Sequence, residues 1–272
     1  MPHITTRDGT NLYVKVWGDG RPVVLMHGWP LSADSWDDQA LALSEAGHKV
    51  IAYDRRGFGR SDQPGKGYEY DTLSDDLADV MKQCGATDAA LVGFSMGGGE
   101  VARYLSRHNG KKIRHVALVS SIVPYMLKTD DNPHGVPSST FDQMTEGMLE
   151  DRAKFFTGFF NDFYGMGLIA APVSDEVLLW SRIVAMQAGL NATLACAKAF
   201  ATTDFRKELS AFTMPTLIIH GTADKTVPID TSARPAAKAI KQSDLVEYDG
   251  AAHGLLATHK NEISRLLVKF LK

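Results

Sequence analysis

The chain has 272 residues, of which 44% are hydrophobic, so it can form one α/β domain with an insertion or two small domains. Its formal net charge is −3, and no uncharged apolar run approaches the roughly 18 residues of a membrane helix, so we expect neither nucleic-acid nor membrane binding. The first eight residues lack the basic and apolar regions of a signal peptide, so we expect a cytoplasmic protein whose Cys84 and Cys196 stay reduced.

Strand and helix patterns alternate along most of the chain. The alternating segment Leu12–Trp17, after a turn at Asp8-Gly9, predicts an antiparallel strand at the beginning of a sheet. Continuous apolar runs predict strands buried on both faces, at 22–26, 50–53, 89–92, 116–119, 216–220 and 245–248. Helical patterns lie between or after them, at 36–46, 73–84, 100–105 and 262–271. We therefore predict an α/β fold with a mostly parallel sheet and helices on both faces.

This alternation stops between Ile122 and Ala211, where buried strand patterns are absent. The segment begins with several proline residues and continues with helical stretches rich in phenylalanine and methionine. We interpret residues 122–211 as a helical lid inserted between two strands of a core formed by residues 1–121 and 212–272. Aromatic and methionine side chains suit an adaptable apolar pocket wall. The alternative is an ordinary helical half of the core without a binding role.

The segment Gly93-Phe94-Ser95-Met96-Gly97 connects the predicted strand at 89–92 to a helical pattern. This is the context of a G-x-S-x-G nucleophile elbow, in which a strained turn presents a serine at the end of a sheet. The flanking positions must be small because strand and helix pass close together there. Taken alone, the pentapeptide is equally compatible with a glycine-rich turn and an incidental serine, because a serine hydroxyl needs a base and an orienting acid to become a nucleophile.

Ligands of open α/β sheets bind beyond the carboxyl ends of the strands. The polar residues that follow the predicted strands include Ser95, Asp224 and His253, in the chain order expected of an α/β-hydrolase. In this arrangement Ser95 attacks an acyl carbonyl, His253 transfers its proton, and Asp224 orients the imidazole. The backbone N–H of Met96 would supply one donor to the oxyanion. Other candidates for the base or the acid are interpreted as structural: His27, His220, His259, Asp230 and Asp249. Ser120 and Ser121 occupy the place where some hydrolases carry the acid.

Other motifs argue against bound nucleotides and metals. The segment Asp54-Arg55-Arg56 is interpreted as a structural turn with a buried ion pair rather than as a phosphate site. Gly57-Phe58-Gly59 lacks the third glycine and the following helix of a dinucleotide motif. The chain contains no H-E-x-x-H motif and no cluster of cysteines, so we expect no cofactor and no metal.

Several segments together carry a resemblance that covers the predicted sheet and lid: His27-Gly28-Trp29-Pro30-Leu31, Tyr53–Ser61, Val92–Gly97, Asp130–Pro137, Thr202–Arg206, His220–Asp224 and Ala252-His253-Gly254. With these motifs the chain resembles an α/β-hydrolase from end to end. More narrowly, it resembles the cofactor-free bacterial haloperoxidases, or perhydrolases, and their relatives among aryl esterases and γ-lactamases. The resemblance implies that the backbone N–H of Trp29 is the second oxyanion donor and that the protein is a homo-oligomer.

The resemblance also implies a serine hydrolase that cleaves small carboxylic esters, with short acyl or aryl groups, through an acyl-enzyme. In the family that the chain resembles, a proline at the position of Pro30 accompanies perhydrolysis, in which hydrogen peroxide attacks the acyl-enzyme and the resulting peracid oxidises halide without a metal. Proline restricts its own φ and the preceding residue, so Pro30 can shift the Trp29 carbonyl toward the incoming peroxide. The alternative is that Pro30 only shapes a turn.

We expect a small-molecule ester or carboxylic acid as substrate, with hydrogen peroxide as a second partner. The substrate pocket, facing Trp29 and Met96, is expected to be small and apolar and to be lined by Phe94, Val123, Phe160, Leu256 and Pro30. Two other functions stay open. One is a lactamase or amidase of the same fold. The other is a non-catalytic binding protein of the same fold, which is disfavoured because serine, aspartate and histidine are all in place.

Overall fold

The computed structural model describes residues 3–110, 112–167 and 170–272. A central sheet contains the strands β1 His3–Thr5, β2 Asn11–Trp17, β3 Arg21–Met26, β4 His48–Tyr53, β5 Ala89–Phe94, β6 Ile113–Val119, β7 Thr216–Gly221 and β8 Ser243–Tyr248. The strand order across the sheet is β1-β2-β4-β3-β5-β6-β7-β8. β2 pairs antiparallel with β1 and β4, and all other neighbouring strands are parallel.

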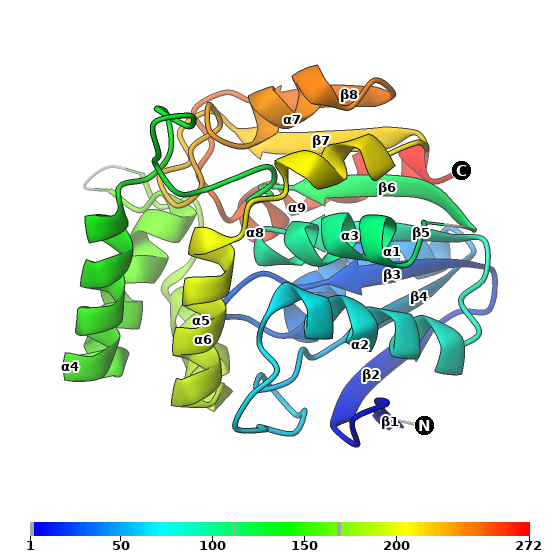
Figure 1. Cartoon of the computed structure of the whole chain (residues 1–272), viewed down its shortest axis with the longest axis horizontal. Helices are drawn as coiled ribbons and strands as arrows, with labels where there is room; N and C mark the ends of the chain where they lie inside the picture. The colour runs from blue at the N-terminus through cyan, green and yellow to red at the C-terminus, as the bar shows by residue number, and fades with distance from the viewer. Residues whose placement is uncertain (1–2, 111, 168–169) are drawn as a thin grey trace.

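Both faces of the sheet are covered by helices: η1 Ala33–Trp36, α1 Asp37–Glu45, α2 Tyr70–Gln83, α3 Met96–Arg107, η2 Arg206–Ala211, α7 Ala233–Ala239, α8 Leu255–Thr258 and α9 Lys260–Phe270. α2 and α3 pack against each other on one face, whereas α1 and α9 pack together on the other (Figure 1). Covering both faces explains why every residue of β5 and β7 is buried. The predicted α/β fold with a mostly parallel sheet is confirmed.

Three helices between β6 and β7 form a separate layer: α4 Ser138–Tyr164, α5 Asp175–Gln187 and α6 Leu190–Thr202. They lie beyond the carboxyl ends of the parallel strands, at the left of Figure 1. α4 is kinked at Asp151, whose φ of −154° and ψ of 91° are not helical. The expected helical insertion between two strands is thus present. The bounds of the lid at residues 122–211 stay a prediction. The helix η2 lies at the end of that range but packs on α3 of the core.

The two edges of the sheet differ from the sequence-based expectation. β1 was not predicted, because three residues are too few to reveal an alternating pattern. β8 was expected to be buried on both faces, but its side chains are half-buried or exposed. It pairs only with β7 and therefore forms the edge of the sheet.

The sequence predicts no helix that could span a membrane. Within the described ranges no single helix is long and apolar enough to cross a membrane. α5 and α6 reach that length and composition only when taken as a pair, and the two are bent by 101° relative to each other.

Candidate active site

Ser95 lies on the sharp turn between β5 and α3, at the carboxyl end of a central strand. Its φ of 52° and ψ of −117° form a strained conformation for a residue with a side chain. The surrounding backbone is close: a Cβ on Gly93 would lie 2.6 Å from the Gly97 carbonyl oxygen, and a Cβ on Gly97 would lie 2.5 Å from the Met26 carbonyl oxygen. The small flanking residues that the sequence motif requires are therefore needed here.

The side chains of Ser95, His253 and Asp224 form a hydrogen-bonded chain. His253 Nε2 lies 2.9 Å from Ser95 Oγ, and His253 Nδ1 lies 2.7 Å from Asp224 Oδ2. The exposed fraction is 5% for Ser95 and Asp224 and 0% for His253. These residues follow β5, β7 and β8, so the ends of three parallel strands bring together side chains that are far apart in the sequence.

Several donors hold the Asp224 carboxylate in place. The backbone N–H groups of Thr226 and Val227 donate to Oδ1 over 2.9 and 2.8 Å. His220 Nε2 lies 3.2 Å from Oδ2 and 2.8 Å from the Val227 carbonyl oxygen, so this nitrogen carries a proton. Burial raises the pKa of Asp224, but the neighbouring His253 and His220 outweigh that effect and bring the pKa down to about 2. Asp224 is therefore ionised at neutral pH.

The sequence indicated a structural role for His220 but not its contact with the acid. His220 is fully buried at the end of β7, four positions before Asp224. The signal that could have revealed the contact is this spacing, because both side chains lie at the carboxyl end of one strand. His220 is a candidate positioning residue for Asp224.

His253 is held through its backbone and by two aromatic rings. The Ser120 hydroxyl donates a hydrogen bond to the His253 carbonyl over 3.0 Å. Ser120 has a φ of 45°, which is uncommon for a residue other than glycine. The rings of Phe94 and Phe163 pack against the imidazole, with centroid distances of 5.3 and 4.8 Å. Sequence reasoning considered Ser120 only as a place where the acid might have been, and it missed this support.

A buried ionic network lies next to the loop that follows β3. The Arg55 guanidinium donates to Glu100 Oε1 over 2.5 Å and to the His27 carbonyl over 2.6 Å. The Tyr53 hydroxyl donates to Glu100 Oε2 over 2.5 Å. Arg55 and Glu100 are each 1% exposed. The buried ion pair expected near Asp54 is therefore confirmed, and it connects the loop after β3 to helix α3.

The expected role of His27 in this loop agrees with its contacts. His27 Nε2 accepts a hydrogen bond from the backbone N–H of Arg55 over 3.0 Å. Burial lowers the pKa of His27, and the nearby Arg55 charge lowers it further. His27 is therefore a neutral structural residue. A second buried ion pair joins Arg56 to Asp76, with two N–O distances of 2.6 Å.

The two expected oxyanion donors come from segments on either side of the sheet's centre. Met96 is the first residue of α3, where backbone N–H groups have no acceptor within the helix. Trp29 follows β3, and its peptide bond to Pro30 is cis. The Trp29 indole donates to the Thr193 carbonyl over 3.0 Å and so ties this loop to lid helix α6. Trp29 and Ser95 line the same cavity. The role of the backbone N–H groups of Trp29 and Met96 as oxyanion donors stays a prediction.

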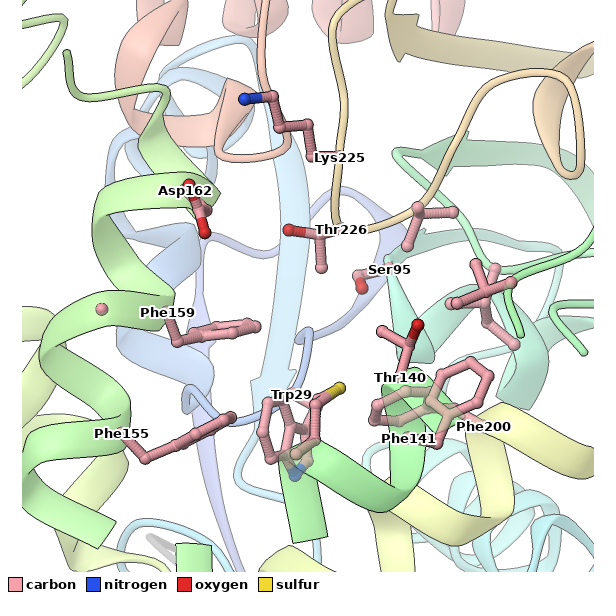
Figure 2. A pocket seen from close by; sticks show the side chains of 15 residues that line it. Trp29, Ser95, Thr140, Phe141, Phe155, Phe159, Asp162, Phe200, Lys225 and Thr226 are labelled. Atoms are coloured by element: carbon pink, nitrogen blue, oxygen red, sulfur yellow. The ribbon is translucent and has the colours of Figure 1, made fainter. Parts of the chain in front are cut away.

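A cavity of about 350 Å³ opens over Ser95. Figure 2 shows Thr140 and Phe141 at one side of it and Phe155 and Phe159 at the opposite side. Both pairs belong to α4, so the kink at Asp151 lets the two halves of this helix border one cavity. The walls are mainly apolar, and polar groups gather near one end: Asp162, Lys225 and Thr226.

The residues expected to line the pocket are not among those that line this cavity. All of them are buried elsewhere: Phe94, Val123, Phe160, Leu256 and Pro30. In four cases a neighbouring residue lines the cavity, namely Ser95, Ile122, Phe159 and Trp29.

Helix α4 shows the physical reason for this difference. Phe155 and Phe159 are one turn apart and face the cavity. Phe156 and Phe160 are also one turn apart, but they lie one position later and are fully buried. One residue turns a helical side chain by about 100°. Pairs of adjacent phenylalanines in a sequence therefore do not reveal which member of each pair faces a ligand.

This geometry suits nucleophilic acyl chemistry. A serine hydroxyl meets an imidazole whose second nitrogen is held by an ionised carboxylate, beside a helix N-terminus and under an apolar cavity. Within the part of the chain that the structure describes, no group of three or more His, Cys, Asp or Glu side chains is arranged to hold a metal ion. Fold and site together are those of a hydrolase of the α/β class.

Comparisons with known proteins lead to the same class. The sequence model of the alpha/beta hydrolase fold matches residues 21–260. The chain is 41% identical to the non-heme chloroperoxidase CPO-A1 of Kitasatospora aureofaciens, across 100% of this chain and 99% of that protein. It is 37% identical to the bifunctional esterase/perhydrolase DCH of Acinetobacter calcoaceticus, across 100% of both. The crystal structure of a bromoperoxidase from Bacillus anthracis matches with a TM-score of 0.95 and 42% identity over 99% of each chain. The chain therefore belongs to the α/β hydrolase fold family, and the expected resemblance to haloperoxidases and perhydrolases is confirmed.

Proposed function

We propose that the protein is a serine hydrolase that cleaves small carboxylic esters through an acyl-enzyme. The observation that carries this proposal is the hydrogen-bonded chain from Ser95 through His253 to Asp224 beneath an apolar cavity. The relatives named as an esterase/perhydrolase and as a non-heme chloroperoxidase support it. The cavity volume of about 350 Å³ is near the lower end of the range of about 300–1,000 Å³ for ligand pockets, which favours short acyl or aryl groups next to Ser95.

In the proposed reaction, Ser95 Oγ attacks the ester carbonyl while His253 Nε2 takes the hydroxyl proton. Asp224 keeps the imidazole oriented and stabilises its charged form. The backbone N–H groups of Met96 and Trp29 donate to the oxyanion that develops on the carbonyl oxygen. His253 then gives its proton to the leaving alcohol, and the acyl group stays on Ser95. Water attacks this ester by the same steps and releases the carboxylic acid.

We propose that hydrogen peroxide also attacks the acyl-enzyme. This attack releases a peracid and restores the Ser95 hydroxyl. The peracid then transfers an oxygen atom to a halide ion, which gives hypohalous acid and the carboxylate, so the halide step needs no metal. Pro30 would favour the peroxide by placing the Trp29 carbonyl where it accepts a hydrogen bond from it.

A paired assay tests both activities at once. One arm measures hydrolysis of p-nitrophenyl acetate, and the other measures bromination of a dye with acetate, hydrogen peroxide and bromide. Each arm is run before and after treatment with a serine-directed organophosphonate. We expect both activities to be present and to disappear together, because one acyl-enzyme serves both. Hydrolysis without bromination would remove the peroxide step.

Two outcomes would replace the ester proposal with another function. Turnover of γ-lactams or amides without turnover of esters would make the protein a lactamase or amidase. A complete lack of reaction with esters, lactams and the organophosphonate would indicate a binding protein that has kept the hydrolase fold. Burst kinetics with p-nitrophenyl acetate measure acyl-enzyme formation directly and separate a binding protein from an acyl hydrolase.

We also propose a cytoplasmic location and a homo-oligomeric state. Fractionation of cells that express the natural gene tests the location, and light scattering after size-exclusion chromatography tests the oligomer. A protein of one chain's mass, 29.7 kDa, would contradict the oligomer.

A further inference from the structure

A second cavity, of about 450 Å³, lies between the first turns of α4 and helix α6. Apart from the half-buried Thr145, its buried and half-buried lining is apolar and includes Leu127, Leu194, Ala195, Ala197 and Ala201. Polar residues that line it, such as Asp142 and Lys198, are exposed. The cavity thus has an apolar interior and a polar rim, and no step of the proposed reaction uses it.

The second cavity borders the cavity over Ser95, because the two share lining residues. Phe141 and Met144, on neighbouring positions of one face of α4, line both cavities and are half-buried. Figure 2 shows Phe141 next to Phe200 at the edge of the active-site cavity, and their ring centroids are 6.3 Å apart. Met144 has an unbranched side chain with three rotatable bonds, which can move aside for a ligand. A ligand that displaces these two side chains would extend from one cavity into the other.

We propose that the second cavity is a subsite of the active site that binds the hydrocarbon tail of a medium-chain ester. This inference rests on the proposed ester hydrolysis and extends its range of substrates. The head of the ester would react at Ser95, and the tail would pass between Phe141 and Met144. The apolar residues on α6 would then remove the tail from water, while the exposed polar rim keeps the empty cavity compatible with solvent.

The expected gain follows from the apolar surface that the tail buries. Each buried methylene contributes about 0.8 kcal/mol, which corresponds to about a fourfold change in kcat/KM. A substitution that fills the second cavity and excludes two or more methylenes should therefore reduce kcat/KM for long esters more than tenfold. It should leave the shortest esters, p-nitrophenyl acetate and methyl acetate, unaffected, because they end within the first cavity.

Ala195→Phe is the test variant, because Ala195 is half-buried and lines only the second cavity. Ala199→Phe is the matched control, since Ala199 lies one turn later on the same helix, is also half-buried and lines neither cavity. kcat/KM is measured for p-nitrophenyl esters from acetate to octanoate, which vary the acyl tail. Alkyl acetates from methyl to octyl vary the alcohol tail. Circular dichroism and thermal unfolding verify that both variants are folded.

We expect Ala195→Phe to lower kcat/KM more than tenfold for the octanoate, the octyl acetate or both, and to change the acetate or methyl ester less than twofold. Ala199→Phe should change neither end of the series by more than twofold. The ester series in which Ala195→Phe lowers kcat/KM shows whether the acyl tail or the alcohol tail enters the subsite. If the folded Ala195→Phe variant keeps the full chain-length profile of the unmodified protein, the subsite proposal is wrong. If the unmodified protein hydrolyses no ester at all, the proposed function fails instead, so the two failures are distinguishable.

Discussion

The polar network around Ser95 and the wall of the cavity above it are built in different ways. The network lies at the carboxyl ends of parallel strands, where directional hydrogen bonds hold Asp224 and His253 from several sides. The wall comes mainly from helix α4, with Phe200 of α6 and residues of the loops after β3, β6 and β7, and it consists mainly of apolar side chains. Single atoms therefore matter in the network, whereas volume matters in the wall. Substitutions in the network should change the rate of reaction or the stability of the fold, and substitutions in the wall should change the range of substrates.

The largest effect is expected at the centre of the network, from Ser95→Ala. Without the nucleophile only binding and the oxyanion donors remain, so kcat for p-nitrophenyl acetate should fall by about 10⁴-fold or more. Ser106→Ala is the control, because Ser106 lies on α3, the helix that follows Ser95, but is exposed and donates to the Arg103 carbonyl. Activity of the Ser95→Ala variant equal to that of the control would remove Ser95 from the mechanism.

The next largest effect concerns the ion pair next to the loop after β3. Arg55→Met leaves the Glu100 charge buried without its partner, which should reduce the free energy of unfolding by about 3–5 kcal/mol. Arg107→Met breaks a partly exposed pair with Asp75 and should cost less than about 1 kcal/mol. Urea unfolding measures both. Equal costs for the two variants would mean that the pair at Arg55 is not the structural anchor that its burial indicates.

A smaller effect is expected where His220 contacts the acid. His220→Leu removes a hydrogen bond to a charged group, worth about 1.5–3 kcal/mol, so kcat should fall about 10- to 100-fold while KM stays nearly unchanged. His220→Gln places a side-chain nitrogen near the position of Nε2 and should recover most of the loss. Steady-state kinetics with p-nitrophenyl acetate provide both constants. A matching loss in both variants would point to packing around His220 rather than to its hydrogen bond.

The pH dependence of stability tests the charge on Asp224. Its pKa is about 2 in the folded protein and 3.8 for the free side chain, so the ionised group stabilises the fold above about pH 4. This contribution is lost as the pH falls from about 4 toward 2, and it should decrease by about 1 kcal/mol between pH 5 and pH 3. The measurement is the difference in unfolding free energy between the unmodified protein and Asp224→Asn at both pH values. A difference that does not depend on pH would mean that the carboxylate is not held in its charged form.

The smallest effect is expected at Pro30, on the loop that joins the network to the lid. Pro30→Leu should lower the ratio of perhydrolysis to hydrolysis by about fivefold, which corresponds to the loss of one hydrogen bond of about 1 kcal/mol to the peroxide. The ratio is measured from the amounts of peracid and carboxylic acid that form when hydrogen peroxide and water compete for the same acyl-enzyme. An unchanged ratio would leave Pro30 as a residue that only shapes the turn.

The polar network was easier to predict from the sequence than the wall. Ser95, Asp224 and His253 each follow an apolar run, and strand ends of a parallel sheet meet at one edge, so the order of the residues along the chain was informative. Their supporting groups were harder to find, because the contact of Ser120 with His253 spans 133 positions. The lining of the cavity could not be derived, because neighbouring phenylalanines of α4 face in different directions.

The sequence by itself determined the α/β class, the elbow at Ser95 and the residues that the elbow needs as partners. These features depend on local properties, namely the period of apolar residues and the need for glycine where backbones pass closely. Only the tertiary structure decided that Arg55 and Glu100 form a buried pair, that His220 contacts Asp224, and that Phe141 and Met144 line two cavities. The physical reason is that contacts between distant segments depend on how helices rotate and cross over the sheet, which no local pattern records.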